Sequence, residues 1–161
     1  MRITGHRIRD HIRLLGPLFG LIAAVFALRM IMAAADTPLW ITRMVSVTVA
    51  TSLSVLLAAL LFHTRGFGSY PNVVVSSLLL NIWSEVLIVV AIAFATLTKT
   101  TNIYTAPEFS IPGDDPLHLK HIYAHLTYGI GTGTLTGAGV GCLVLWLLRR
   151  IAPVRSGEGN L

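Results

Sequence analysis

Three histidines lie close together in the second half of the chain, in the stretch His118-Leu119-Lys120-His121-Ile122-Tyr123-Ala124-His125. At about 100° per residue of an α-helix, these three positions fall within about 60° of one another, so the imidazoles share one face. Neutral imidazole is a ligand for zinc, copper and iron. The spacing of His118, His121 and His125 therefore predicts a candidate metal site, to which the preceding loop offers Glu108, Asp114 or Asp115 as an extra ligand.

The competing interpretation of the histidines is a polar belt at a membrane interface. Lys120 places a cation among the ligands, and the sequence contains neither Cys-x-x-Cys nor His-Glu-x-x-His. Haem is a sharper alternative, because Gly129 follows His125 at i+4 and leaves space for a porphyrin. Two axial histidines would need a partner at the same depth, and His63 is expected at the opposite interface, so haem would take one axial ligand or a neighbouring chain.

A single acidic residue, Glu85, lies near the middle of the apolar stretch 71–98. An ionisable group inside a membrane is costly, and it marks a candidate functional site. Asn81 lies one turn earlier and shares its face with Ser77 and Ser84. One interpretation is a proton or ion relay in which Glu85 titrates. The alternative, favoured by the lack of a second acid in the spans, is a carboxylate that is protonated or paired with Arg29 or Arg43 and fixes helix register.

Four glycines, Gly129, Gly133, Gly137 and Gly141, recur at i+4 in the last apolar stretch. In water each interior glycine costs a helix about 1 kcal/mol relative to alanine. In lipid such a stripe lets another helix approach closely. It predicts packing against the small faces of the first or second span, or association with a second chain, and the sequence favours neither.

Composition places the chain among integral membrane proteins. Of its 161 residues 54% are hydrophobic and only 12% are charged, and the mean hydropathy is +0.74. The net charge of +5 comes from basic residues beside apolar stretches rather than from a basic face with aromatics, which indicates lipid headgroups and not nucleic acid. The lone Cys142 has no partner for an intramolecular disulfide.

The predicted fold is an all-α integral membrane protein, an antiparallel bundle of four transmembrane helices. The spans cover 14–35, 39–63, 71–98 and 122–150, within a membrane domain of 14–152. The loop 99–116 is the one sizeable extramembrane segment. Within it, Asp115 and Pro116 predict the N-cap and first residue of a helix that leads into the fourth span, and Asp36 and Pro38 do the same for the second span.

The two ends of the chain lie outside the spans. Residues 1–13 carry four arginines and predict a short basic amphipathic segment on anionic lipid headgroups, followed by a retained signal anchor rather than a cleaved signal peptide. Residues 153–161 predict a disordered tail. Most arginines flank one side of the predicted spans, so the positive-inside rule places both termini in the cytoplasm and the long loop with its histidines outside. The predicted location is a bacterial inner (plasma) membrane.

No catalytic motif is present, and three functions compete. The first is a non-enzymatic multi-pass protein that acts as a subunit or assembly partner, in a homo-oligomer or larger complex, through the glycine face. The second is a metal- or haem-binding protein that uses the histidines, with electron transfer as its role. The third is a proton-coupled transporter or channel subunit that uses Glu85.

Overall fold

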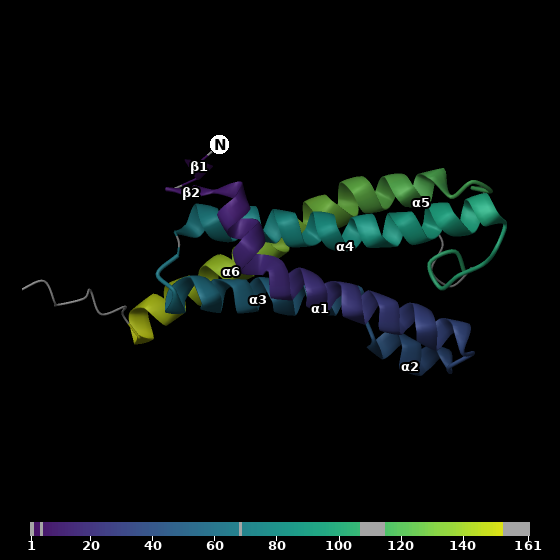
Figure 1. Ribbon diagram of the computed structural model, residues 1–161, viewed down its shortest axis with the longest axis horizontal. Coiled ribbons are helices and arrows are strands. Elements are labelled where there is room, and N and C mark those ends of the chain that lie inside the picture. The colour runs from purple at the N-terminus through teal and green to yellow at the C-terminus, as the bar shows by residue number, and fades with distance from the viewer. Residues whose placement is uncertain (1, 4, 68, 107–114, 153–161) are drawn as a thin grey trace, which may run out of the picture.

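The computed structural model describes residues 2–3, 5–67, 69–106 and 115–152, and helices make up most of this part of the chain (Figure 1). Four helical stretches are long and apolar enough to cross a membrane, so the chain is a multi-pass membrane protein. The helices are α1 (Ile8–Ala34), α2 (Leu39–Met44), α3 (Val47–Thr64), α4 (Tyr70–Thr98), α5 (Leu119–Ala124), a π-helical turn η1 (His125–Gly129) and α6 (Ile130–Ile151).

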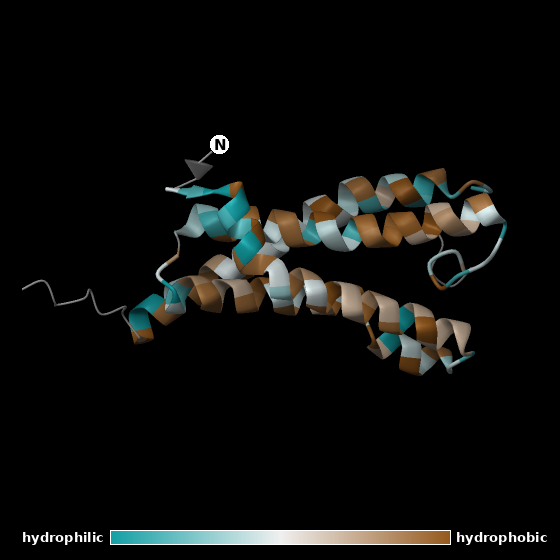
Figure 2. Cartoon of the chain, in the orientation of Figure 1, coloured by the Kyte–Doolittle hydropathy of each residue, from teal (hydrophilic) through white to brown (hydrophobic). Residues whose placement is uncertain are grey.

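Helix α4 lies at the centre of the fold. It packs against α6, α3 and α1, and α6 packs in addition against α3. In Figure 1, α5 lies alongside the second half of α4, whereas α6 crosses to the side of α3. The main apolar core joins α1, α3 and α4 through residues such as Leu15, Val55 and Leu80. In the cartoon of Figure 2, brown hydrophobic residues recur along all the long helices, as is expected of helices in lipid.

Short strands and the start of the first helix lie within the predicted basic segment, whose contact with lipid headgroups stays a prediction. Two short strands, β1 (Arg2–Ile3) and β2 (His6–Arg7), pair antiparallel around Gly5, whose φ of 90° suits the turn. Helix α1 then begins at Ile8, well before the predicted start of the first span at residue 14. His11 is fully buried against the bundle, so this part of 1–13 belongs to the first helix.

The second predicted span, 39–63, is divided into α2 and α3. The helix stops at Val45, and Ser46 starts α3 by accepting a hydrogen bond from the backbone N–H of Val49 at 3.4 Å. Pro38 is the N-cap of α2, so Asp36 lies outside the helix that it was expected to cap. The third span, predicted as 71–98, agrees closely with α4.

The fourth span begins later than Asp115 and Pro116 indicate. Helix α5 starts at Leu119, and His118 precedes it in a left-handed conformation with φ of 53°. Glu108 and Asp114, and the tail 153–161 for which we predict disorder, lie outside the described residues. The described part of the loop, 99–106, folds back onto α1, where Tyr104 stacks on Phe26 with 5.9 Å between ring centroids.

Candidate functional site

Glu85 projects from the middle of α4 and forms a short hydrogen-bonded contact with His125. Its Oε2 lies 2.5 Å from His125 Nδ1, and Glu85 as a whole is only 8% exposed. The sequence offered Arg29 or Arg43 as the partner. In the structure Arg29 lies instead over the ring of Tyr104, 5.2 Å from its centroid, and Arg43 lies in the last turn of α2. The histidine partner holds the carboxylate between α4 and the fourth span.

A second imidazole extends this pair. His125 Nε2 lies 3.1 Å from His121 Nε2, and the two rings stack with 4.9 Å between centroids. One nitrogen must donate and the other accept, and the tautomers follow from the partners. His121 Nδ1, at the far end, is buried and has no hydrogen-bond partner among the described residues. Glu85, His125 and His121 thus form one hydrogen-bonded chain, the Glu–His–His chain.

The π-helical turn His125–Gly129 sits where this chain joins the helix. Such turns occur frequently at functional sites, because the wider helix re-aims the side chains of one turn. Gly129, the last residue of this turn, makes room for the carboxylate, because a Cβ at this position would lie 2.8 Å from Glu85 Cδ. The sequence gives no signal for the π turn, whereas the glycine is the visible sign of the close approach.

The remaining glycines of the stripe face the same helix. A Cβ on Gly133 would collide with the Asn81 amide, and one on Gly137 would lie 2.6 Å from Ser77 Oγ. At Gly141 the neighbours are Val73 of α4 and Val55 of α3. The stripe therefore packs inside the chain, against α3, which belongs to the predicted second span, and against α4, which the sequence had not named. Association with a second chain through these glycines stays a prediction.

A polar groove surrounds the Glu–His–His chain. It has a volume of about 460 Å³ and lies between α3, α4 and the fourth span. Hydroxyl and amide groups line it beside the three ionisable side chains. They belong to Thr48, Thr51, Ser52, Asn81, Ser84, Thr132 and Thr136. These polar side chains lie beside Glu85 within an otherwise apolar helix bundle.

Asn81 and its neighbours continue the polar face of α4 away from Glu85. Asn81 Nδ2 donates to the Ser77 carbonyl at 2.8 Å, and Ser77 Oγ donates to the Thr134 carbonyl at 3.1 Å. At the start of the helix, Asn72 Oδ1 lies 3.2 Å from Nε2 of the buried His11. Neither His11 nor Asn72 is among the candidate residues of the sequence analysis. The recurrence of polar residues at helical spacing upstream of Ser77 is the signal that leads to Asn72.

The predicted metal site is not assembled among the described residues. They contain no group of three or more His, Cys, Asp or Glu side chains arranged to hold a metal ion. His118 lies outside the helix, with its ring centroid 6.5 Å from that of His121. The Asp115 carboxylate accepts a hydrogen bond from the backbone N–H of His121 at 3.2 Å, so it serves the helix start. Zinc or copper binding stays a prediction.

Haem binding against the glycine stripe conflicts with the packing. The face that begins at Gly129, where a porphyrin would lie, is occupied by side chains of α4, with Glu85 against Gly129 and Asn81 against Gly133. His125, the expected axial ligand, uses both ring nitrogens within the Glu–His–His chain. A haem ligated by His125 therefore has neither the space nor the free nitrogen that it needs.

Comparison of the chain with models of protein families, with curated proteins and with solved structures finds no match. The function must therefore be argued from the site itself.

Proposed function

We propose that this protein translocates protons across a membrane, with Glu85 as the proton-binding group at the centre of the bundle. One observation carries the proposal: Glu85, His125 and His121 are linked by contacts of 2.5 Å and 3.1 Å inside a polar groove. Proton relays in membrane proteins are built from such chains of carboxylate and imidazole groups. An anchor that only fixed helix register would need neither the second histidine nor the groove.

The Glu–His–His chain can pass a proton and leave both imidazoles neutral. With Glu85 ionised, His125 donates from Nδ1–H to Oε2 and accepts at Nε2 from the Nε2–H of His121. This arrangement leaves a lone pair on His121 Nδ1. When Nδ1 takes up a proton, His121 releases its Nε2 proton to His125, and His125 releases its Nδ1 proton to Glu85. One proton enters, one reaches the carboxylate, and each ring ends neutral in its other tautomer.

The polar face of α4 offers the onward route. From Glu85 it runs through Ser84, Asn81 and Ser77 to Asn72, and all five residues are buried. At about 1.5 Å per residue this path covers about 20 Å, roughly two-thirds of the hydrocarbon thickness of a bilayer. The serine and asparagine side chains on this route do not ionise near neutral pH. The proposed route therefore depends on water bound along their hydroxyl and amide groups.

The orientation that we propose follows from the basic residues. Arginines near the N-terminus, Arg65 after α3 and Arg149–Arg150 at the end of α6 belong to one side, which is the cytoplasm by the positive-inside rule. His121 then lies toward the outer side and Asn72 toward the inner side. We propose a bacterial inner membrane as the location, with uptake beginning at His121.

Proton flux into liposomes tests this function. The purified protein is placed in vesicles that contain potassium and a pH-sensitive dye, and valinomycin sets an inside-negative potential. We expect wild-type vesicles to acidify faster than empty ones and Glu85→Gln to lower the protein-dependent rate at least about tenfold. Asp10→Asn is the matched control, because Asp10 is an exposed carboxylate that caps α1. Wild-type vesicles that behave as empty ones, or Glu85→Gln vesicles that behave as wild type, contradict the proposal.

A further inference from the structure

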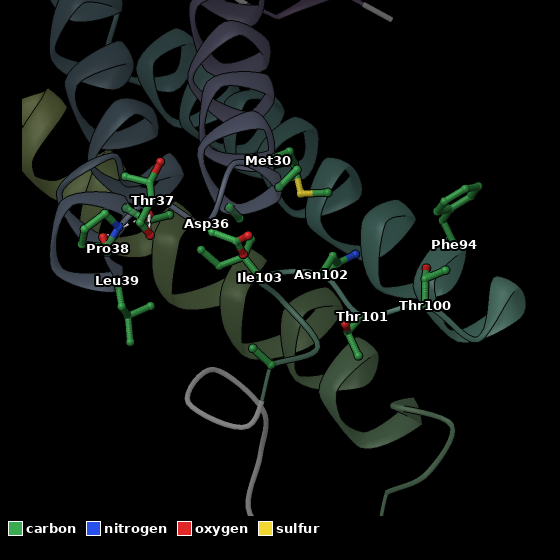
Figure 3. Close-up of a pocket in the computed structure, with 14 residues that line it drawn as sticks. Met30, Asp36, Thr37, Pro38, Leu39, Phe94, Thr100, Thr101, Asn102 and Ile103 are labelled. Carbon is green, nitrogen blue, oxygen red and sulfur yellow. Dashed lines mark hydrogen bonds between the residues drawn. The ribbon is translucent and has the colours of Figure 1, made fainter.

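A second, larger pocket lies at the end of the bundle where α1 meets α2. It has a volume of about 720 Å³, within the range of sites that hold small organic molecules. Figure 3 shows Asp36, Thr37, Pro38 and Leu39 on one side of it, and Phe94, Thr100 and Thr101 on the other. The pocket is separate from the polar groove, because no residue lines both.

Most of the wall is apolar. Met30 and Ala33 come from the last turns of α1, Leu39 from α2, Phe94 from α4 and Ile103 from the loop. Threonine hydroxyls at positions 37, 42, 100 and 101 add hydrogen-bonding groups at its edge. This combination suits a molecule with an apolar body and a small polar or charged part.

The charge of the pocket comes from one residue. Asp36 is the one ionisable side chain among the described residues that line it, and its carboxylate has no ion pair or hydrogen bond to another described residue. The neighbouring Arg29 is directed to Tyr104. Burial raises the pKa of Tyr104 to about 12 although Arg29 acts to lower it, so this phenol adds no second negative charge near the pocket. Asp36 is itself exposed, and a carboxylate at the edge of an apolar wall attracts a cation rather than an anion.

The local backbone does not explain the choice of aspartate. Asp36 has φ of 51°, a left-handed conformation that glycine adopts without strain and asparagine tolerates equally well. Its backbone N–H reaches the Ala33 carbonyl at 3.2 Å, so the turn is held by main-chain atoms. A negative charge just past the C-terminus of α1 also opposes the helix dipole. The carboxylate therefore carries a cost to folding that a role in binding would account for.

We propose that this pocket binds a monovalent organic cation with an apolar body, whose charge is held by Asp36. The apolar part lies against Met30, Leu39 and Ile103. Phe94, on the opposite side of the pocket, adds apolar surface for the body of the molecule. The proposal is independent of proton translocation, since it concerns binding at equilibrium.

Two ions of the same shape and opposite charge test the proposal. Binding of tetraphenylphosphonium and of tetraphenylborate is measured by equilibrium dialysis, with the protein in nanodiscs of phosphatidylcholine. We expect the wild type to bind the phosphonium in preference to the borate. Asp36→Asn should weaken phosphonium binding at least about tenfold and leave the borate unchanged or slightly tighter. Asp10→Asn, which alters a carboxylate outside this pocket, should change neither.

A second variant keeps the carboxylate and fills the space. Ala33→Phe places a ring in the pocket, and we expect it to weaken phosphonium binding although Asp36 is intact. Equal wild-type affinity for the two ions, or phosphonium binding that survives both Asp36→Asn and Ala33→Phe, would overturn the proposal. Neither result would bear on proton flux, which depends on Glu85, so the two proposals fail separately.

Discussion

Two histidines contact the polar face of α4, and their surroundings differ. His11 is fully buried, with Nδ1 3.1 Å from the Arg7 carbonyl and Nε2 3.2 Å from Asn72 Oδ1, and the rings of Phe62 and Phe67 lie against it edge to face. His125 contacts a carboxylate and a second imidazole, and it lines a groove. The same side chain is thus placed once among neutral partners and once among ionisable partners that line a groove.

This difference separates an anchor from a relay. His11 has neutral acceptors at both ring nitrogens and lines none of the described pockets, so it ties the start of α1 to the start of α4. The chain at His125 ends in a buried ring nitrogen of His121 that has no partner among the described residues. A histidine moves protons only if it has an ionisable neighbour and a way in. We therefore expect loss of His11 to affect stability alone and loss of His125 to affect proton movement as well.

The largest effect is expected for His125→Ala. It removes proton uptake, and it leaves Glu85 without its partner. Leaving a buried polar group without its hydrogen-bond partner costs about 1–3 kcal/mol, and we expect about 2 kcal/mol here. Unfolding in mixed micelles of dodecyl maltoside and SDS, followed by circular dichroism, measures the stability. The double variant Glu85→Gln with His125→Ala should recover stability but not flux. Proton uptake that persists in His125→Ala would contradict the comparison.

The opposite pattern is expected for His11→Ala. The change empties a fully buried position and leaves the Asn72 amide without its imidazole partner, at a cost of about 2 kcal/mol in unfolding. At equal amounts of folded protein, the proton flux per molecule should match the wild type. A flux that falls as far as it does in His125→Ala would show that His11 belongs to the path.

A smaller effect is expected at the glycines, where two neighbours on one helix give a matched pair. A Cβ on Gly133 collides with the Asn81 amide, which is held by its hydrogen bond to Ser77, whereas a Cβ on Gly131 meets nothing within 4 Å. Gly133→Ala should therefore destabilise the protein by about 1 kcal/mol. Gly131→Ala should leave the stability unchanged or raise it slightly, because alanine is the better helix former. Equal unfolding curves for the two variants would mean that α6 does not pack on α4 as described.

The smallest effect concerns the start of α5. Desolvation acts to raise the pKa of the Asp115 carboxyl, but the backbone N–H groups of His121, Lys120 and Leu119 outweigh it and lower the pKa below 3.8. The folded pKa is depressed, so the capping stability is present above the unfolded value and is lost as the pH falls through the folded value. Hydrogen exchange at these three amides should quicken, relative to its intrinsic rate, below pH 3.8 in the wild type. In Asp115→Asn the ratio of the observed to the intrinsic exchange rate at these amides should not change with pH.

Much of the fold was visible in the sequence, because hydropathy and chain breaks determine where membrane helices lie. The third predicted span, 71–98, matches α4 closely, since Pro71 fits the first helical turn and Lys99 ends the helix in a left-handed conformation. The first helix begins earlier than the predicted span, where His11 contacts Asn72, whereas the fourth begins later than Asp115 and Pro116 indicate. The buried contact between His11 and Asn72 joins residues 61 positions apart, which no local pattern reports.

The site was visible only as separate parts. Glu85 stood out as an acid in an apolar stretch, and His121 and His125 as neighbours at i+4. Whether these three side chains contact one another depends on how α4 and the fourth span pack. The sequence instead indicated arginine partners for Glu85. Gly129 is the residue that indicates where Glu85 packs, because any side chain at this position would displace the Glu85 carboxylate. Polar residues on one helix that face glycines on another are a pattern worth seeking elsewhere.

The contact between the two imidazoles is the step on which the account depends, and NMR can observe it directly. Protein with ¹⁵N-labelled histidine is measured in micelles for scalar coupling between His121 Nε2 and His125 Nε2 across the shared hydrogen, with His121→Ala to assign the signals. We predict a coupling between these two nitrogens, together with a His125 Nδ1 that is protonated and bonded to a carboxylate. Two uncoupled rings with independent tautomers would contradict the Glu–His–His chain and, with it, the proposed path of the proton.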